Sequence, residues 1–229
     1  MSLLNLESFY EKFIDFYTCG VSDALKSIKV DDLLYLSQKI VDTRDKRGTV
    51  YCFGNGGSAG IASHFVHNLN WDVSANMPDN KKIKAIALND QCCHMTGIAN
   101  DRHYDQVFAA QLKNLLEKND LVIGISASGN SENVLEAIKY TKERGVNFVT
   151  LTGCDGGLLK KLGNFNINVD YEDQQISEDV QHAICHMVVR MLHYYNLGES
   201  RNVGVFSDIA QLRLKEDYLK ARENNKVIV

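Results

Sequence analysis

Residues 50–60 read VYCFGNGGSAG, a short apolar run that ends in a glycine-rich turn. The run combines a β-branched residue with aromatic ones, which is typical of a buried strand. The glycines let the backbone turn sharply and approach a ligand closely. The residues that follow open a helical pattern. A strand, a tight turn and a helix in this order predict one unit of a parallel α/β sheet.

Further apolar runs follow at 83–88, 121–125, 148–151 and 165–169. Most of them are separated from the next by a segment long enough for a helix, as expected for parallel strands joined by crossovers. Helical periodicity also predicts two amphipathic helices within residues 1–48 and a last long helix from about residue 176 to 195. The sequence therefore predicts an α/β fold: a three-layer α/β/α sandwich with a five-stranded parallel sheet, preceded by N-terminal helices.

The composition excludes several classes of protein. The chain has 229 residues, a formal net charge of -4, six Cys and one Pro, with no Gly/Ser-rich linker. We expect one core at 49–197, helices 1–48 packed on it and forming an oligomer interface, and a C-terminal extension at 198–229. No basic region favours nucleic acid, and no apolar run suggests a membrane span or a signal peptide. The expected location is the cytoplasm, with the cysteines as free thiols.

A second candidate ligand turn follows the third apolar run, where residues 126–132 read SASGNSE. Ser126, Ser128 and Ser131 supply three hydroxyls at the start of a helix, and the N-terminus of a helix favours anions. Capping of the helix is the simpler explanation, but a cap needs one hydroxyl. The three together predict a phosphate site.

The first turn also fits the pattern G-x-G-x-x-A of dinucleotide-binding proteins. That reading needs an acidic residue about 20 positions further on, at the end of the second strand. Asp90 comes about 30 positions after the turn, which is late for that role. A P-loop is excluded more firmly, because neither turn ends in Gly-Lys-Ser or Gly-Lys-Thr.

Five motifs occur together in the chain: 54–59 (GNGGSA), 63–65 (SHF), 98–101 (IAND), 126–131 (SASGNS) and 151–153 (LTG). In this order they resemble the sugar isomerase (SIS) domain, and more narrowly its phosphoheptose isomerase branch, which converts sedoheptulose 7-phosphate to D-glycero-D-manno-heptose 7-phosphate. The resemblance covers roughly residues 33–195. It implies a flavodoxin-like SIS fold, a phosphorylated sugar as the substrate, and a homotetramer with its sites between subunits.

The resemblance also implies roles for individual residues. The implied sugar contacts are Asn55, Gly56, Gly57, Ser58, Asn100, Asp101 and Gln175, with Ser58 assisting at the start of its helix and Asp101 reaching across a subunit boundary. The implied phosphate contacts are Ser126, Ala127, Ser128 and Ser131. Ala127 stands where a Thr is common in the family, so this chain has one hydroxyl fewer in its phosphate loop.

The family further implies a zinc site, formed by a His and a Glu on one helix and a Gln and a His on another. The matching positions here are His64, Asn68, Glu178 and His186, so a carboxylate and an amide have changed places. Two histidines and one carboxylate still suit a catalytic metal. We therefore expect Zn²⁺, or another divalent ion, one per site, on His64, Glu178 and His186, with Asn68 as a weak fourth ligand or a substrate contact.

The exchange also affects proton transfer, because the amide of Asn68 cannot act as the base that the family's Glu supplies. Glu178 or His186 is expected to take over that role. The spacing places Glu178 in the first turn of the last helix. An alternative is that His182 and His186, four residues apart on one helix face, bind the metal and leave Glu178 as a helix cap.

These expectations favour a metal-assisted aldose-ketose isomerase acting on a phosphosugar, most specifically on sedoheptulose 7-phosphate. The sequence also leaves two alternatives open. The chain could be a non-catalytic phosphosugar-binding or scaffold protein of the same fold. It could also be an isomerase or epimerase that acts on a related sugar phosphate, because Asn68 replaces the family's catalytic Glu.

Overall fold

The computed structural model of the chain describes residues 3–75, 77–163 and 165–197. Its helices and strands follow one another in the order α1 Leu3–Lys26, α2 Val30–Asp45, β1 Val50–Phe53, α3 Gly56–Asn70, η1 Asp79–Lys81, β2 Ala85–Ala87, η2 Leu88–Asp90, α4 Cys92–Asp101, η3 Tyr104–Gln106, α5 Ala109–Leu115, β3 Leu121–Ser126, α6 Glu132–Glu143, β4 Asn147–Gly153, α7 Gly157–Lys161, β5 Asn166–Val169 and α8 Gln174–Leu197. The predicted extension 198–229 lies outside the described residues.

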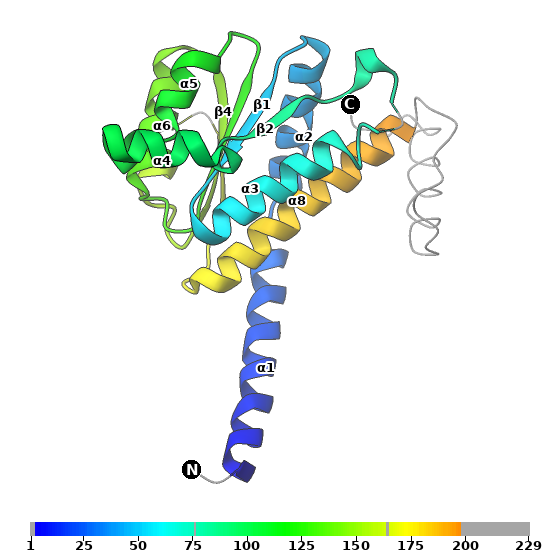
Figure 1. Cartoon of the computed structure of the whole chain (residues 1–229). Helices are drawn as coiled ribbons and strands as arrows, with labels where there is room; N and C mark the ends of the chain where they lie inside the picture. Colours follow the sequence, from blue (N-terminus) through cyan, green and yellow to red (C-terminus); the bar gives the residue numbers. More distant parts are fainter. Residues whose placement is uncertain (1–2, 76, 164, 198–229) are drawn as a thin grey trace.

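The five strands form a single parallel sheet in the order β2-β1-β3-β4-β5 (Figure 1). In register, Val50 pairs with Ala85 on one side of β1 and with Leu121 on the other. This is the doubly wound, flavodoxin-like order, in which the chain reverses direction across the sheet between β1 and β3. The predicted fold class is thereby confirmed, and each of the five predicted strands is present with ends shifted by at most a few residues.

The side chains of β1 alternate between two hydrophobic cores, one on each face of the sheet. Val50 and Cys52 pack with α2, α3 and α8, whereas Tyr51 and Phe53 pack with α5 and α6. All four positions of the strand are buried, as expected for a sheet covered by helices on both faces. The three layers are visible in Figure 1, with α3 and α8 side by side over one face.

The first helix, α1, projects beyond the body of the protein (Figure 1). Its last part packs on the core through Tyr17, Val21 and Leu25. Gly20 makes this contact possible, because a Cβ there would collide with Ile176 of α8 and with Tyr171, which precedes α8.

The last helix begins at Gln174, about two residues earlier than its apolar pattern indicates. Asp173 explains the difference, because its side chain accepts a hydrogen bond from the backbone N–H of Ile176 at 3.0 Å and its carbonyl accepts one from Ser177 at 2.9 Å. An aspartate in this position satisfies donors of the first turn and starts the helix. Among the described helices, none combines the length and the apolar character needed to cross a membrane.

Candidate active site at the carboxyl ends of the strands

The two predicted ligand turns lie next to each other, because they follow the neighbouring strands β1 and β3. The turn after β1 leads into α3, and the turn after β3 leads into α6. Ligands of open parallel sheets bind at this edge, beside the point where the strand order reverses. The arrangement therefore brings two helix N-termini and two loops to one place.

The hydroxyls of the serine loop, residues 126–131, converge on one another. Ser126 Oγ lies 3.0 Å from Ser131 Oγ and 3.5 Å from Ser128 Oγ. Ser131 occupies the N-cap position of α6, but its side chain makes no capping bond there. The capping explanation therefore does not account for the three hydroxyls. The backbone N–H of Val134 in the first turn is already bonded to Asn133 Oδ1, so the N–H groups that precede it in α6 are the ones that another acceptor can use.

A close approach between two loops holds the serine loop in shape. Gly129 has a φ of +64°, and a Cβ at this position would collide with the carbonyl oxygen of Gly156. The backbone N–H of Leu159 donates to the Gly129 carbonyl at 3.0 Å, and that of Gly153 donates to the Ala127 carbonyl at 2.9 Å. Only glycine fits this crowded left-handed position at low cost.

The carboxylate of Glu178 lies over the glycine turn that begins α3. A Cβ built on Gly57 would lie 2.7 Å from Glu178 Cδ and would overlap Oε2. Because α8 begins at Gln174, Glu178 lies in the second turn of that helix, not in the first turn as the spacing predicts. Its carboxylate lies against the N-terminal end of α3. The positive end of the helix dipole favours a negative charge there.

The serine loop and the Glu178 region are parts of one continuous site. Ser177, the neighbour of Glu178, packs against Gly153, where an added Cβ would meet Ser177 Cβ at 2.6 Å and the Ala127 carbonyl oxygen at 2.9 Å. The end of β4 therefore touches α8 on one side and the serine loop on the other. This chain of contacts connects the serine loop with the residue next to Glu178.

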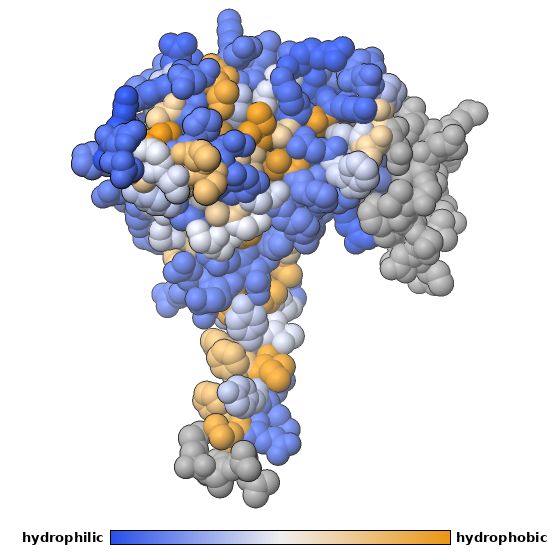
Figure 2. Space-filling model, in the orientation of Figure 1, coloured by the Kyte–Doolittle hydropathy of each residue, from blue (hydrophilic) through white to orange (hydrophobic). Residues whose placement is uncertain are grey.

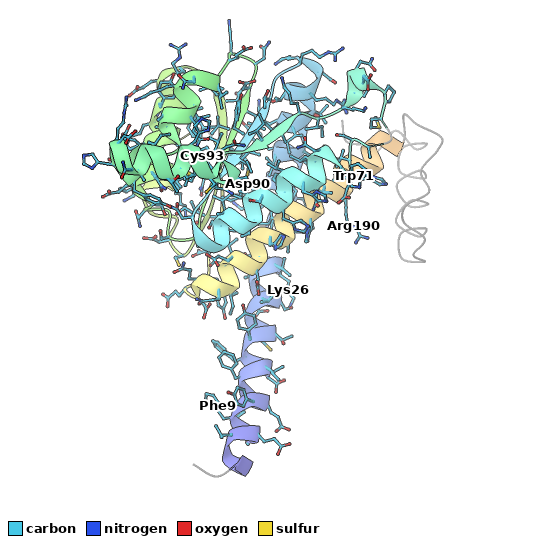
Figure 3. All side chains as sticks on the ribbon, viewed as in Figure 1. Phe9, Lys26, Trp71, Asp90, Cys93 and Arg190 are labelled. Carbon is cyan, nitrogen blue, oxygen red and sulfur yellow. The ribbon has the colours of Figure 1, made fainter. Side chains whose placement is uncertain are left out.

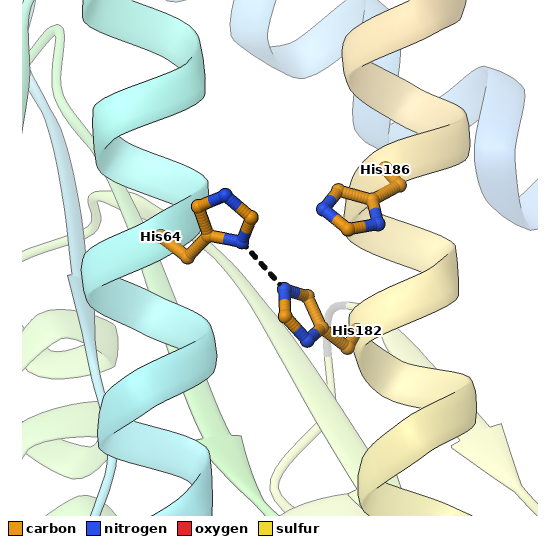
Figure 4. A group of neighbouring side chains, drawn as sticks. All are labelled: His64, His182 and His186. Atoms are coloured by element: carbon orange, nitrogen blue, oxygen red, sulfur yellow. Dashed lines mark hydrogen bonds between the residues drawn. The ribbon is translucent and has the colours of Figure 1, made fainter.

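Three histidines lie together further along the same two helices (Figure 4). His64 comes from α3, and His182 and His186 come from α8; their ligand atoms all lie within 4.8 Å of one another. His64 Nδ1 is 2.7 Å from His182 Nε2, so one of these nitrogens donates to the other. His182 is four residues after Glu178, about one helical turn or roughly 6 Å along α8.

The surroundings of His182 and His186 favour the neutral form of both rings. Burial lowers the pKa of His182, and the nearby His186 and His64 lower it further. Burial also lowers the pKa of His186, followed by the effects of His64 and Arg190. Neutral imidazoles are the form that binds a metal ion.

The histidine cluster suits a transition metal such as zinc. Imidazole nitrogens bound at about 2.0–2.1 Å in a tetrahedron are roughly 3.4 Å apart, so only small ring movements separate this arrangement from a ligand set. His64 and His186 are exposed, which leaves room for a further ligand. Within the described residues, Glu178 is not part of this group, and the predicted set of His64, Glu178, His186 and Asn68 stays a prediction.

The other residues predicted to contact the metal or the sugar lie on α3, α4 and α8. Asn68 lies one turn after His64 on α3 and is only 4% exposed. Asn100 donates to Asp101 at 2.9 Å at the exposed end of α4. The reach of Asp101 into another subunit stays a prediction. Ser58 is buried in the first turn of α3, and Gln175 is exposed in the first turn of α8.

Three residues near the site, His182, Asn133 and Tyr104, are marked weakly or not at all by the sequence patterns. His182 was visible as the partner of His186 at a four-residue spacing, yet the family pattern favoured other ligands. Asn133 and Tyr104 both bond to Asn55, and no motif marks either of them. Their contacts join segments that are 78 and 49 residues apart in sequence, which periodicity does not reveal.

Comparison with known proteins agrees with this geometry. Residues 17–153 match the SIS domain model. The chain is 36% identical over 166 residues to a probable phosphoheptose isomerase of Thermoplasma acidophilum, covering 72% of this chain and 90% of that one. It is also 36% identical over 160 residues to the phosphoheptose isomerase of Helicobacter pylori strain HPAG1, covering 68% of this chain and 82% of the relative.

A solved structure extends the likeness to three dimensions. The phosphoheptose isomerase of Neisseria gonorrhoeae superimposes with a TM-score of 0.73 at 26% identity, covering 82% of this chain and 98% of that protein. The predicted resemblance is thereby confirmed: with the serine loop, the glycine turn and the paired helices α3 and α8 in place, the chain belongs to the SIS domain family and, within it, to the phosphoheptose isomerases.

Proposed function

We propose that the protein is a metal-assisted phosphosugar isomerase that converts sedoheptulose 7-phosphate to D-glycero-D-manno-heptose 7-phosphate. The observation that carries this proposal is the continuity of the site. The serine loop contacts Gly153, Gly153 contacts Ser177, and the next residue, Glu178, lies over Gly57. An anion site and a carboxylate are thereby joined across one sheet edge, and the relatives named above carry the same activity in their names.

The serine loop holds the phosphate of the substrate. Its converging hydroxyls donate to phosphate oxygens once they give up their mutual hydrogen bonds, and the N-terminus of α6 adds backbone donors. The missing hydroxyl at Ala127 leaves the three serines as the side-chain donors. The backbone at Ala127 itself is fixed by the bond from Gly153.

Glu178 is the group that moves the proton between the two reacting carbons. Its carboxylate takes the proton from C1 of the ketose while the C2 carbonyl oxygen takes a proton from solvent, which gives an enediol. Glu178 then returns its proton to C2 while the C1 hydroxyl loses its proton to solvent, which yields the aldose and restores the carboxylate. Glu178 fits this role better than Asn68, whose amide does not accept the proton, and its carboxylate lies over the N-terminal end of α3.

The metal ligands in this proposal are His64, His182 and His186, with Zn²⁺ as the preferred ion. A bound divalent ion supplies a Lewis acid that polarises the substrate carbonyl. Three neutral imidazoles are a common ligand set for catalytic zinc, with one position left open. With the metal on the three histidines, Glu178 is free for proton transfer. In the ligand set predicted from the sequence, Glu178 would be bound to the metal.

The direct test is an NMR time course of sedoheptulose 7-phosphate with zinc-loaded protein, which reports both conversion and the identity of the product. We expect Glu178→Gln to abolish turnover while inorganic phosphate still binds. Glu143→Gln, at the exposed far end of α6, is the control and keeps full activity. Turnover retained in Glu178→Gln would remove Glu178 as the base. Binding without any conversion by the unmodified protein would favour the non-catalytic alternative.

We further propose that α1 joins copies of this chain into a homo-oligomer. The proposed number of copies is four, as the resemblance to the family implies. The projecting half of the helix carries a row of exposed apolar side chains (Figures 2 and 3), namely Phe9, Tyr10, Phe13, Ile14 and Phe16. Each of them is at least 49% exposed. An apolar row of this kind, continuous with a helix anchored on the core, is typical of an association surface.

A further inference from the structure

Asn55 occupies an N-cap position but does not cap its helix. It precedes α3 with extended backbone angles, φ -114° and ψ 151°, and its side chain makes no bond to the first turn. An asparagine at this position usually accepts a hydrogen bond from that turn. The side chain instead reaches Asn133, in the first turn of α6, and so spans the gap between the glycine turn and the serine loop.

The backbone of α6 fixes the orientation of the Asn133 amide. The N–H of Val134 lies 2.9 Å from Asn133 Oδ1, and a backbone N–H can only donate. The acceptor must therefore be the oxygen, which places Asn133 Nδ2 on the side of Asn55. Asn133 is 2% exposed, so this orientation is also protected from water.

The orientation of the Asn55 amide follows from that of Asn133. Asn133 Nδ2 donates to Asn55 Oδ1 at 2.9 Å, and Asn55 Nδ2 donates back to Asn133 Oδ1 at 2.8 Å. The hydroxyl of Tyr104 donates to the same Asn55 Oδ1 at 3.1 Å. Asn55 Oδ1 thus has two donors, which matches its two lone pairs. Of the two hydrogens on Asn55 Nδ2, one is donated to Asn133; the second has no acceptor among the residues that the structure describes and is available to a ligand.

We propose that Asn133 is a positioning residue that makes Asn55 a hydrogen-bond donor to the substrate, with Tyr104 supporting the same orientation. The inference rests on the proposed function. It specifies the chemistry of the contact: Asn55 donates to a substrate oxygen, such as the carbonyl or enediolate oxygen of the reacting carbons. A donor placed in advance gains most when that oxygen becomes negatively charged.

The competing explanation is that Asn133 only ties the two turns together and stabilises the fold. The two explanations differ in whether Asn133 acts through Asn55. A double-mutant cycle separates them, because residues that act through one contact are not additive. Thr141→Ala is the matched control, since Thr141 is also fully buried on α6 and its hydroxyl donates to the Ala137 carbonyl at 2.8 Å.

The experiment measures kcat and KM for sedoheptulose 7-phosphate, and the Kd of inorganic phosphate, in zinc-loaded protein. We expect Asn133→Ala to lower kcat by about 10-fold, a fraction of the 10²–10³-fold that loss of a direct oxyanion donor costs. The Kd of inorganic phosphate stays within about 2-fold, because the serine loop is unchanged. In an Asn55→Ala background the further loss is less than about 2-fold.

Three outcomes would overturn the inference. The first is a fall in kcat for Asn133→Ala that is no larger than the fall for Thr141→Ala. The second is a fall in kcat of the same size when Asn133→Ala is added to Asn55→Ala. The third is a loss of inorganic phosphate affinity as large as the loss in kcat. If the unmodified protein does not convert sedoheptulose 7-phosphate, the proposed function fails by itself. The double-mutant cycle is then measured as binding affinity by calorimetry. Asn133→Ala should weaken binding of sedoheptulose 7-phosphate but not of inorganic phosphate. An affinity for sedoheptulose 7-phosphate equal to that of the unmodified protein would refute the positioning role.

Discussion

A single methyl group at Gly57 should disable the site without unfolding the protein. The Cβ of Ala would lie 2.7 Å from Glu178 Cδ and would overlap Oε2, whereas an ordinary contact between such atoms is at least 3.4 Å. The carboxylate must therefore move by roughly 1 Å. A displacement of that size at a reacting group costs about 10²-fold in rate.

The stability of Gly57→Ala should change little. Gly57 does not have a positive φ, and the atoms it would meet are the end of a flexible side chain. Replacing glycine by alanine within a helix stabilises it by about 0.5–1 kcal/mol, which offsets the cost of moving the glutamate. We therefore expect the free energy of unfolding in urea to stay within about 1 kcal/mol of the unmodified value.

Gly60→Ala provides the control, because Gly60 lies in the same helix and a Cβ there has nothing within 4 Å. The assay is the NMR time course with sedoheptulose 7-phosphate, run in parallel on both variants. In a Glu178→Ala background, Gly57→Ala should have no further effect on turnover. Turnover of Gly57→Ala equal to that of Gly60→Ala would refute the role given to Glu178.

Three further predictions concern the histidine cluster, the projecting helix and a helix contact. His182→Ala should lower the affinity for Zn²⁺ by at least about 10-fold in calorimetry, whereas His67→Ala, on the same surface but outside the cluster, should not; equal affinities would exclude His182 as a ligand. Phe13→Glu should reduce the mass measured by light scattering to that of a smaller assembly, while Glu11→Lys on the same helix leaves it unchanged. The hydrogen bond from Tyr17 to α8 raises the pKa of Tyr17 to about 12, so it stabilises the fold below pH 10 and is lost as the pH rises toward 12. Urea unfolding of Tyr17→Phe should therefore show a deficit of less than about 1 kcal/mol at pH 8 that shrinks by pH 11, and a deficit independent of pH would contradict this assignment.

Local chemistry explains how much of the fold was predictable. The apolar run at 50–53 is buried on both faces of the sheet, so its sequence is continuously hydrophobic and easily recognised. The glycine turn and the serine loop are also local signals, because the conformation and the hydroxyls they need are encoded within a few adjacent residues. The start of α8 was missed by about two residues, since Asp173, not the apolar pattern, begins that helix.

The sequence by itself determined the five-stranded α/β fold, the two ligand turns and the family, since each depends on residues close together in the chain or on motifs in a fixed order. Only the tertiary structure decided which side chains meet. His64 and His182 are 118 residues apart and touch because α3 and α8 pack side by side on one face of the sheet. The carboxylate of Glu178 reaches Gly57 for the same reason, and Asn133 reaches Asn55 because β1 and β3 are neighbours. Periodicity identifies the buried face of a helix, but the partner of that face depends on how the helices are arranged over the sheet.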